Sequence, residues 1–118
     1  MSLKSTFTNA SRGLWVFIKS EPNNRFHLTL AVLALAGGWL LNISTPEWLA
    51  IIVSIGVVLS AEAFNASLEH LCDMVHKEHH PRIKVVKDIS AAAVLIAALI
   101  ALAVALVVFI PRLWALTG

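Results

Sequence analysis

Charged residues are scarce in this chain of 118 amino acids. Asp, Glu, Lys and Arg together make up 14% of the sequence, whereas about 25% is typical of soluble domains. Hydrophobic residues account for 58%, and they gather in long blocks separated by short polar stretches. The net charge is only +2 and no basic stripe alternates with aromatic residues, so binding to nucleic acid is not expected. This composition favours an integral membrane protein.

Several other features are absent. Cys72 is the single cysteine, which excludes an intrachain disulfide. Residues 1–20 lack the continuous apolar core and the cleavage site of a signal peptide, so we expect the first membrane span to direct insertion. The phosphate-binding Gly-x-x-x-x-Gly-Lys-Ser/Thr loop and the protein-kinase signatures are also missing. Because no linker or repeat divides the sequence, we predict a single domain over residues 1–118.

The spacing of apolar residues predicts an all-α fold with three membrane spans. Residues 3–20 place apolar side chains at helical spacing and basic ones elsewhere on the turn, which is typical of an amphipathic helix on the membrane surface. Three longer apolar blocks follow, each suited to crossing a bilayer. The spans are predicted at residues 26–43, 48–75 and 89–110.

Local signals suggest where these helices end and how they pack. Gly37 and Gly38 would allow a neighbouring helix to approach the first span closely. Residues 76–88 form a predicted polar loop, with Asp88 placed to cap the third span. Pro111 is expected to end that span, because proline cannot donate a backbone hydrogen bond.

Basic residues lie mainly on one side of the predicted spans. They precede the first span and recur in the 76–88 loop, whereas the turn over residues 42–47 has none. The positive-inside rule therefore places the amino terminus and the 76–88 loop in the cytoplasm and the carboxy terminus outside. Arg112, beyond the third span, is the exception.

A polar stripe marks the cytoplasmic end of the second span. Glu62, Asn65, Glu69 and Asp73 fall within an arc of about 80° when read as a helix at about 100° per residue. Charged groups within a span cost several kcal/mol unless they face a cavity, a partner or a cation. The stripe is therefore where the function should be sought.

Acidic groups at this depth suit either ion relay or the binding of a divalent metal. Glu69 can meet Glu21 at the end of the surface helix, and such a carboxylate pair binds Mg²⁺ together with substrate phosphates. Lys87 adds a cation at the predicted start of the third span, where free backbone N–H groups would also attract anions. Glu62, the deepest of the stripe, suits a general base acting on a lipid alcohol. The alternative, that Glu62 and Asn65 only form hydrogen bonds across a helix interface, stays open.

Histidines were considered as metal ligands. His76, His79 and His80 lie close together, but no cysteine or second histidine set completes a zinc site, so spacing alone suggests solvated loop residues. His27 and His70 are expected to be interfacial or helix-packing residues.

The second-span motif Glu-x-x-Asn-x-x-x-Glu-x-x-x-Asp, over residues 62–73, resembles the signature of the prokaryotic diacylglycerol kinase family. Further blocks that resemble the family occur in the same order. They are Ala10-Ser-Arg12-Gly13, Glu21-Pro-Asn-Asn-Arg25-Phe-His27, His79-His80-Pro81 and Lys84-Val-Val-Lys87-Asp88. The resemblance covers nearly the whole chain. Departures at Asn9, Pro22 and Ala66 remove no catalytic group.

The resemblance implies roles for individual residues. Glu62 matches the catalytic base, and Glu21 and Glu69 match the metal-binding carboxylates. The remaining matched residues fall into two groups. Nucleotide binding is implied for Glu78, His79, His80, Lys87 and Asp88. Substrate or phosphate positioning is implied for Asn65, Arg12, Arg25 and Asp73.

The resemblance also implies a homotrimeric lipid kinase of the inner membrane that uses ATP and Mg²⁺. An oligomer is expected on physical grounds as well, since three spans cannot enclose the polar stripe alone. The His-His-Pro loop, the Lys-x-x-Lys-Asp spacing and the ending Val-Phe-Ile-Pro-Arg look more like members that phosphorylate undecaprenol than like those that phosphorylate diacylglycerol. A non-enzymatic, proton-coupled transporter that uses Glu62 and Glu69 as relay groups is the alternative of another class.

Overall fold

The computed structural model of the chain describes residues 2–20, 24–76 and 78–118. These residues form four α-helices and no strand. The helices are α1 (Leu3–Ser20), α2 (Asn24–Leu41), α3 (Thr45–Val75) and α4 (Pro81–Thr117). Helices α2, α3 and α4 are long and apolar enough to cross a membrane, which confirms the all-α fold with three candidate spans.

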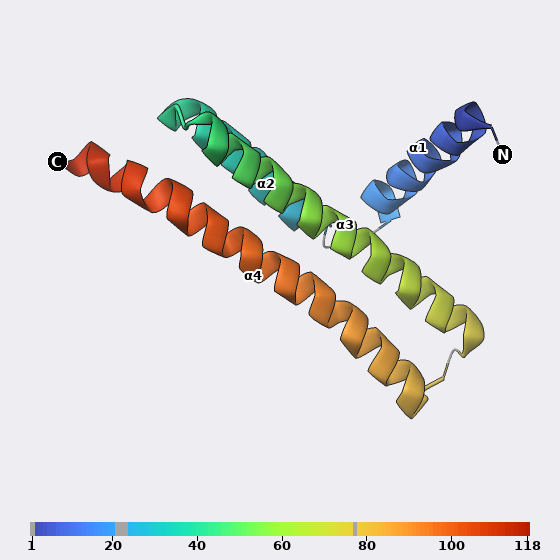
Figure 1. Ribbon diagram of the computed structural model, residues 1–118. Helices are drawn as coiled ribbons and strands as arrows, with labels where there is room; N and C mark the ends of the chain where they lie inside the picture. Colours follow the sequence, from blue (N-terminus) through green and yellow to red (C-terminus); the bar gives the residue numbers. More distant parts are fainter. Residues whose placement is uncertain (1, 21–23, 77) are drawn as a thin grey trace.

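Helices α3 and α4 pack side by side as a long hairpin, and α2 lies against the first part of α3 (Figure 1). Helix α1 runs in a different direction, and none of its residues is buried. Its apolar side chains are open, with Leu3 and Phe7 91% and 76% exposed. An amphipathic helix of this kind needs lipid or another chain to cover its apolar side, in agreement with the predicted surface helix.

Helix α2 ends at Leu41, two residues before the predicted end. Asn42 adopts a left-handed conformation with φ of 55°. Its N–H donates to the carbonyl of Trp39 over 3.3 Å, and the N–H of Ile43 donates to that of Gly38 over 3.2 Å. This pair of bonds is the Schellman arrangement that ends many helices.

Helix α3 begins at Thr45, so the predicted start at residue 48 was wrong. Ser44 caps the helix, and its hydroxyl accepts from the N–H of Glu47 while the Glu47 side chain accepts from the N–H of Ser44. This reciprocal capping box, with Pro46 in the first turn, is a strong start signal that the apolar pattern alone does not include.

Helix α4 is longer at both ends than the predicted 89–110. It starts at Pro81, with His80 as its N-cap, so the polar loop is confined to residues 76–80. Asp88 therefore lies inside the helix rather than capping it, and it accepts a hydrogen bond from Lys84 one turn earlier. Pro111 also lies inside the helix, which continues to Thr117. Proline removes only one backbone donor there, a loss that membrane helices tolerate.

The apolar core lies where the three spans meet, near the α2–α3 turn. Ile43, Ile51 and Val108 are buried there. A Cβ added to Gly38 would lie 2.9 Å from side-chain atoms of both Ile43 and Trp48. Only glycine at position 38 therefore permits this approach of Trp48 on α3, as predicted, whereas a Cβ at Gly37 would meet Phe109 at an ordinary contact distance of 3.4 Å.

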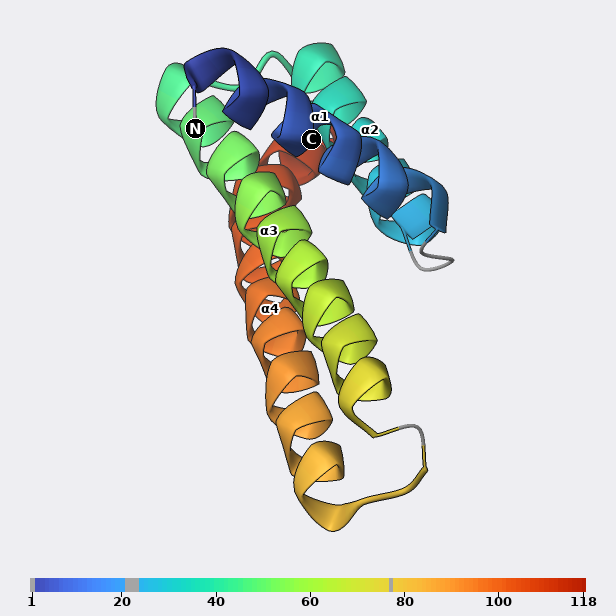
Figure 2. The ribbon, with the colours of Figure 1, turned by 90° about the vertical axis from the view of Figure 1, so that its right-hand side faces the viewer.

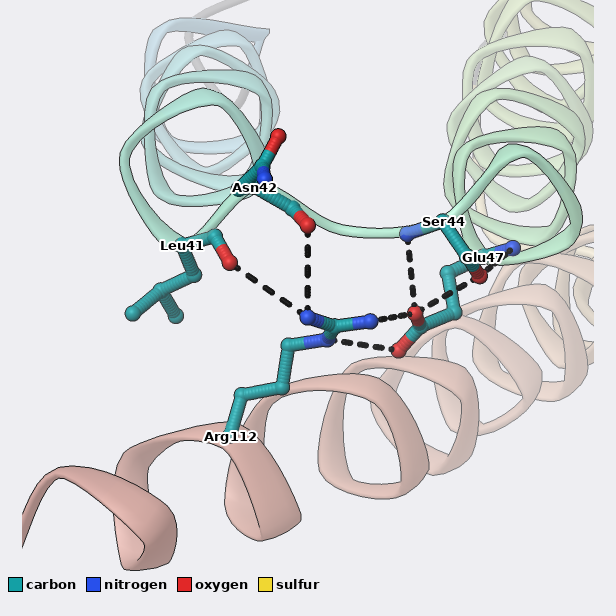
Figure 3. Close-up of polar contacts among 5 residues, drawn as sticks. All are labelled: Leu41, Asn42, Ser44, Glu47 and Arg112. Carbon is teal, nitrogen blue, oxygen red and sulfur yellow. Dashed lines mark hydrogen bonds and ion pairs between the residues drawn. The ribbon is translucent and has the colours of Figure 1, made fainter.

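Arg112 ties the same end of all three spans together (Figure 3). Its guanidinium forms two hydrogen bonds with the carboxylate of Glu47, one of them from Nε to Oε2 at 3.1 Å. It also donates to the carbonyls of Leu41 and Asn42, over 3.4 and 3.2 Å. Arg112, the basic residue that does not follow the positive-inside distribution, therefore has a structural role as a clamp. Its planar guanidinium can form two parallel hydrogen bonds with a carboxylate, which lysine cannot do.

Replacing Arg112 with Met should lower the thermal unfolding midpoint in detergent micelles, because Glu47 and two carbonyls lose their partner. Glu47→Gln should have a similar effect. The double variant should be no less stable than the less stable single variant, since both remove one shared interaction. Arg82→Met, at the exposed start of α4, is the matched control. An Arg112→Met midpoint equal to that of the control would contradict the clamp.

Candidate active site

The polar stripe predicted on the second span lies on one side of α3, and its burial falls along the helix. Glu62 is 8% exposed, Asn65 and Glu69 are half-buried, and Asp73 is exposed. The last turns of α3 and the first turns of α4 project past α1 and α2 (Figure 2). The stripe therefore leads from the interior of the helical bundle to the open end of the α3–α4 hairpin.

Glu62 is paired with His27 from the first turn of α2. Nε2 of the imidazole lies 2.7 Å from Oε1 of the carboxylate. The side chains are 20% and 9% exposed, respectively, so water has little access to the contact. Buried carboxylates require such partners, because an isolated charge in a low-dielectric interior is strongly unfavourable. The pairing explains how α3 accommodates an acidic residue at this depth.

Asn65 and Glu69 interact one turn further along α3. Nδ2 of Asn65 donates to Oε1 of Glu69 over 3.3 Å. Oε2 of Glu62 and Oδ1 of Asn65 are buried and have no hydrogen-bond partner among the described residues. Buried oxygens are almost always satisfied in native proteins, so these two mark a place where a cation, a water or a substrate hydroxyl belongs.

The alternative of bonds across a helix interface is correct in one respect. Glu62 does pair across an interface, with α2, whereas Asn65 pairs within its own helix. These contacts use Oε1 of Glu62 and the amide nitrogen of Asn65, and they leave Oε2 of Glu62 and Oδ1 of Asn65 without a partner among the described residues. The stripe is therefore anchored by helix contacts and still keeps acceptor oxygens available for chemistry.

Lys87 connects α4 to the stripe. Its Nζ lies 2.7 Å from Oδ1 of Asp73 on α3, and this ion pair joins the two helices at the open end of the hairpin. Lys87 lies well inside α4, so the prediction that free N–H groups at a helix start surround it was wrong. The free N–H groups belong to the turn that begins at Pro81, beside His80.

The loop residues implied in nucleotide binding lie at the end of the hairpin. Glu78 and His79 are exposed, and His80 accepts a hydrogen bond from the N–H of Arg82 through Nδ1. The rings of His76 and His80 meet edge to face with their centroids 5.3 Å apart. The loop thus presents polar and aromatic groups at the start of α4, the helix that carries Lys87 and Asp88.

The predicted metal pair is described only in part. Glu69 is placed on α3, whereas Glu21 lies outside the residues that the structure describes. Over residues 2–20, 24–76 and 78–118, no three His, Cys, Asp or Glu side chains are grouped so that they could hold a metal ion. Arg12 and Arg25 are exposed, and within the same residues neither side chain has a polar contact with the stripe.

An apolar groove of about 310 Å³ begins beside the Glu62–His27 pair. Phe26 and His27 line its start, and it continues between α2, α3 and α4 as far as Ile51 and Ala105. It therefore runs along the spans toward the apolar core. The sequence did not predict this groove, since it depends on how three helices are placed together.

Sequence reasoning also missed the contact that His27 makes with the stripe. His27 was interpreted as an interfacial or packing residue, although it closes a block that resembles a kinase family motif. Its spacing within that block was the available signal. Because the contact joins two helices, only the packing of α2 on α3 identifies its partner.

Comparisons with known proteins identify the family to which the chain belongs. Residues 8–109 match the model of the family described as prokaryotic diacylglycerol kinase. The chain is also 37% identical over 108 residues to the undecaprenol kinase of Bacillus subtilis (strain 168), a match that covers 92% of this chain and 88% of the relative. A kinase rather than a transporter is what both findings support. The chain therefore belongs to the prokaryotic diacylglycerol kinase family and is a lipid kinase.

Proposed function

We propose that this lipid kinase transfers the γ-phosphoryl group of ATP to undecaprenol, giving undecaprenyl phosphate and ADP. The observation that carries the proposal is the buried Glu62 carboxylate, which has one oxygen without a partner among the described residues and pairs with His27 at the start of an apolar groove. A lipid alcohol combines the two groups that such a place accommodates, a hydroxyl and a long apolar chain. The 37% identity to an undecaprenol kinase supports undecaprenol as the acceptor. The family description names diacylglycerol instead.

Glu62 acts as the general base. The lipid hydroxyl gives its proton to Oε2 of Glu62, and the lipid oxygen bonds to the γ-phosphorus in line with the leaving group. The bond from that phosphorus to the β,γ-bridging oxygen breaks, and ADP leaves with the electron pair. The contact of Glu62 with His27, which lines the groove, supports this role, because positioning supplies much of the rate in phosphoryl transfer.

Glu69 and Glu21 hold Mg²⁺, with Asn65 nearby. The donor set fits, because carboxylate and amide oxygens are the ligands that Mg²⁺ prefers. The buried Oδ1 of Asn65 lacks a partner among the described residues, and the adjacent Glu69 is half-buried. When bound, the metal supplies positive charge that neutralises the phosphates.

The end of the α3–α4 hairpin binds the nucleotide. Lys87, which is paired with Asp73, contacts the phosphates. Asp88 is the next residue of α4 and belongs to the same nucleotide site. Glu78, His79 and His80 contact the adenosine end from the loop. Arg12 and Arg25 help position the phosphates or the lipid head. The support is that Lys87 pairs with Asp73 at the exposed end of the stripe and that His80 caps the same helix α4.

The chain is a single domain that works as a homotrimer in the inner membrane. The amino terminus and the 76–80 loop face the cytoplasm, where ATP is available, and the carboxy terminus lies outside. The exposed stripe supports an oligomer, since Glu69 and Asp73 of one chain remain partly open to a neighbour. The basic residues on the loop side support the orientation.

The acceptor can be identified with purified protein, radiolabelled ATP and Mg²⁺ in mixed micelles that contain either undecaprenol or diacylglycerol. We expect kcat/KM to be at least about tenfold higher for undecaprenol than for diacylglycerol, because even small differences in apolar contacts change kcat/KM about tenfold. Omission of Mg²⁺ should stop the reaction. Faster phosphorylation of diacylglycerol would overturn the proposed acceptor and leave the lipid kinase assignment in place.

Glu62→Gln should lower kcat by about 100- to 10,000-fold, the range that a general base contributes. The amide has nearly the same shape but cannot take the hydroxyl proton. Glu47→Gln is the matched control, because it makes the same exchange at the opposite end of α3. Below its unfolding temperature, that variant should retain its kcat. Undiminished transfer by folded Glu62→Gln would remove Glu62 from its proposed role.

The proposed role of the groove in binding the lipid acceptor can be tested by placing a large side chain in it. Ala101 lines the groove, whereas Ala103, two residues along α4, is exposed and does not. Ala101→Phe should raise the KM for undecaprenol about tenfold or more and leave the KM for ATP unchanged, because only the apolar chain loses contacts. Ala103→Phe should alter neither value. Equal KM values for the two variants would exclude this groove as the acceptor site.

A further inference from the structure

His27 holds one oxygen of the proposed catalytic carboxylate, and three observations bear on what this contact does. The first is its location. The 2.7 Å contact between Nε2 of His27 and Oε1 of Glu62 joins the first turn of α2 to the middle of α3. Both side chains are largely shielded from water. Hydrogen bonds to charged groups are stronger in such surroundings than at an exposed surface.

The second observation concerns the two carboxylate oxygens. An ionised carboxylate can only accept hydrogen bonds, so the facing ring nitrogen must carry the proton whether the imidazole is neutral or charged. Oε1 is therefore engaged by His27. Oε2 is buried and unpartnered among the described residues. The contact makes the oxygens unequal, with one held in place and the other available.

The third observation is that neighbouring polar groups have other partners. The amide of Asn65 donates to Glu69, and the ammonium of Lys87 donates to Asp73. Neither group contacts Glu62. The orientation of the carboxylate therefore depends on α2, and His27 also lines the groove at its start.

We propose that His27 is a positioning residue, whose Nε2–H orients Glu62 so that Oε2 faces the hydroxyl of the lipid acceptor. The inference rests on the proposed role of Glu62. Without His27, the carboxylate would rotate among several orientations, and only a fraction of bound complexes would have the reacting atoms aligned. Such a loss lowers the rate of the chemical step and leaves the binding of both substrates nearly unchanged.

The experiment compares kcat and both KM values for His27→Ala and His27→Gln in the purified full-length enzyme. His27→Ala should lower kcat about 10- to 100-fold, the loss that typically follows removal of a group that orients a reactive one. Both KM values should stay within about twofold, as expected for an interaction made in the transition state. His27→Gln should recover most of the rate, because its amide can donate from a similar position.

Thr29→Ala is the matched control on α2. Thr29 is exposed, and its hydroxyl bonds only to the carbonyl of Arg25 in its own helix. Its kcat should equal that of the unmodified enzyme. If the role of His27 were purely structural, His27→Ala would lower the unfolding midpoint while its folded fraction kept a normal kcat. His27→Gln would then not recover the stability. This result would overturn the inference.

The variants also separate this inference from the proposed function. A normal kcat for His27→Ala together with an inactive Glu62→Gln would overturn the positioning role and leave Glu62 as the base. Full activity of Glu62→Gln would instead overturn the base itself.

Discussion

The burial of the Glu62 carboxylate is the constraint on which the arrangement of the helices depends. A charge at this depth is unfavourable by several kcal/mol unless a partner reaches it. The partner, His27, comes from the first turn of α2. From His27 to the end of α2 there are 15 residues (27–41), and from the start of α3 to Glu62 there are 18 (45–62), so the two side chains lie at comparable depths from the turn. The short turn between them therefore sets the register that brings the imidazole to the carboxylate.

The two ends of the bundle are built for different tasks. At the α2–α3 turn, Arg112 clamps α4 to Glu47 and to two carbonyls, and the apolar core lies just inside. At the other end, α3 and α4 extend beyond α2, and side chains become more exposed from Glu62 to Asp73. A lipid kinase needs this gradient, since one substrate arrives from the membrane and the other from water. The closed end keeps the helices together so that the open end can remain polar.

Much of the fold could be predicted from the sequence, because the side chains on one face of a helix recur every three to four residues. The surface helix over residues 3–20 and the stripe of Glu62, Asn65, Glu69 and Asp73 follow from that period alone. The start of α4 could not be predicted in the same way, because polar residues after Pro81 resemble a loop although they continue the helix. The pairs Glu62–His27 and Glu47–Arg112 depend on the register between helices, which apolar periodicity does not define.

The polar residues do not distinguish between the two candidate acceptors, because undecaprenol and diacylglycerol both present a primary hydroxyl. The distinction has to come from the shape of the apolar contacts. The groove beside His27 lies between three helices, and its lining includes the small side chains of Ala31, Ala98 and Ala101. Larger side chains at these positions would narrow it. In the proposed mechanism the choice of substrate therefore depends on helix packing around the groove, whereas the chemistry depends on the stripe on α3.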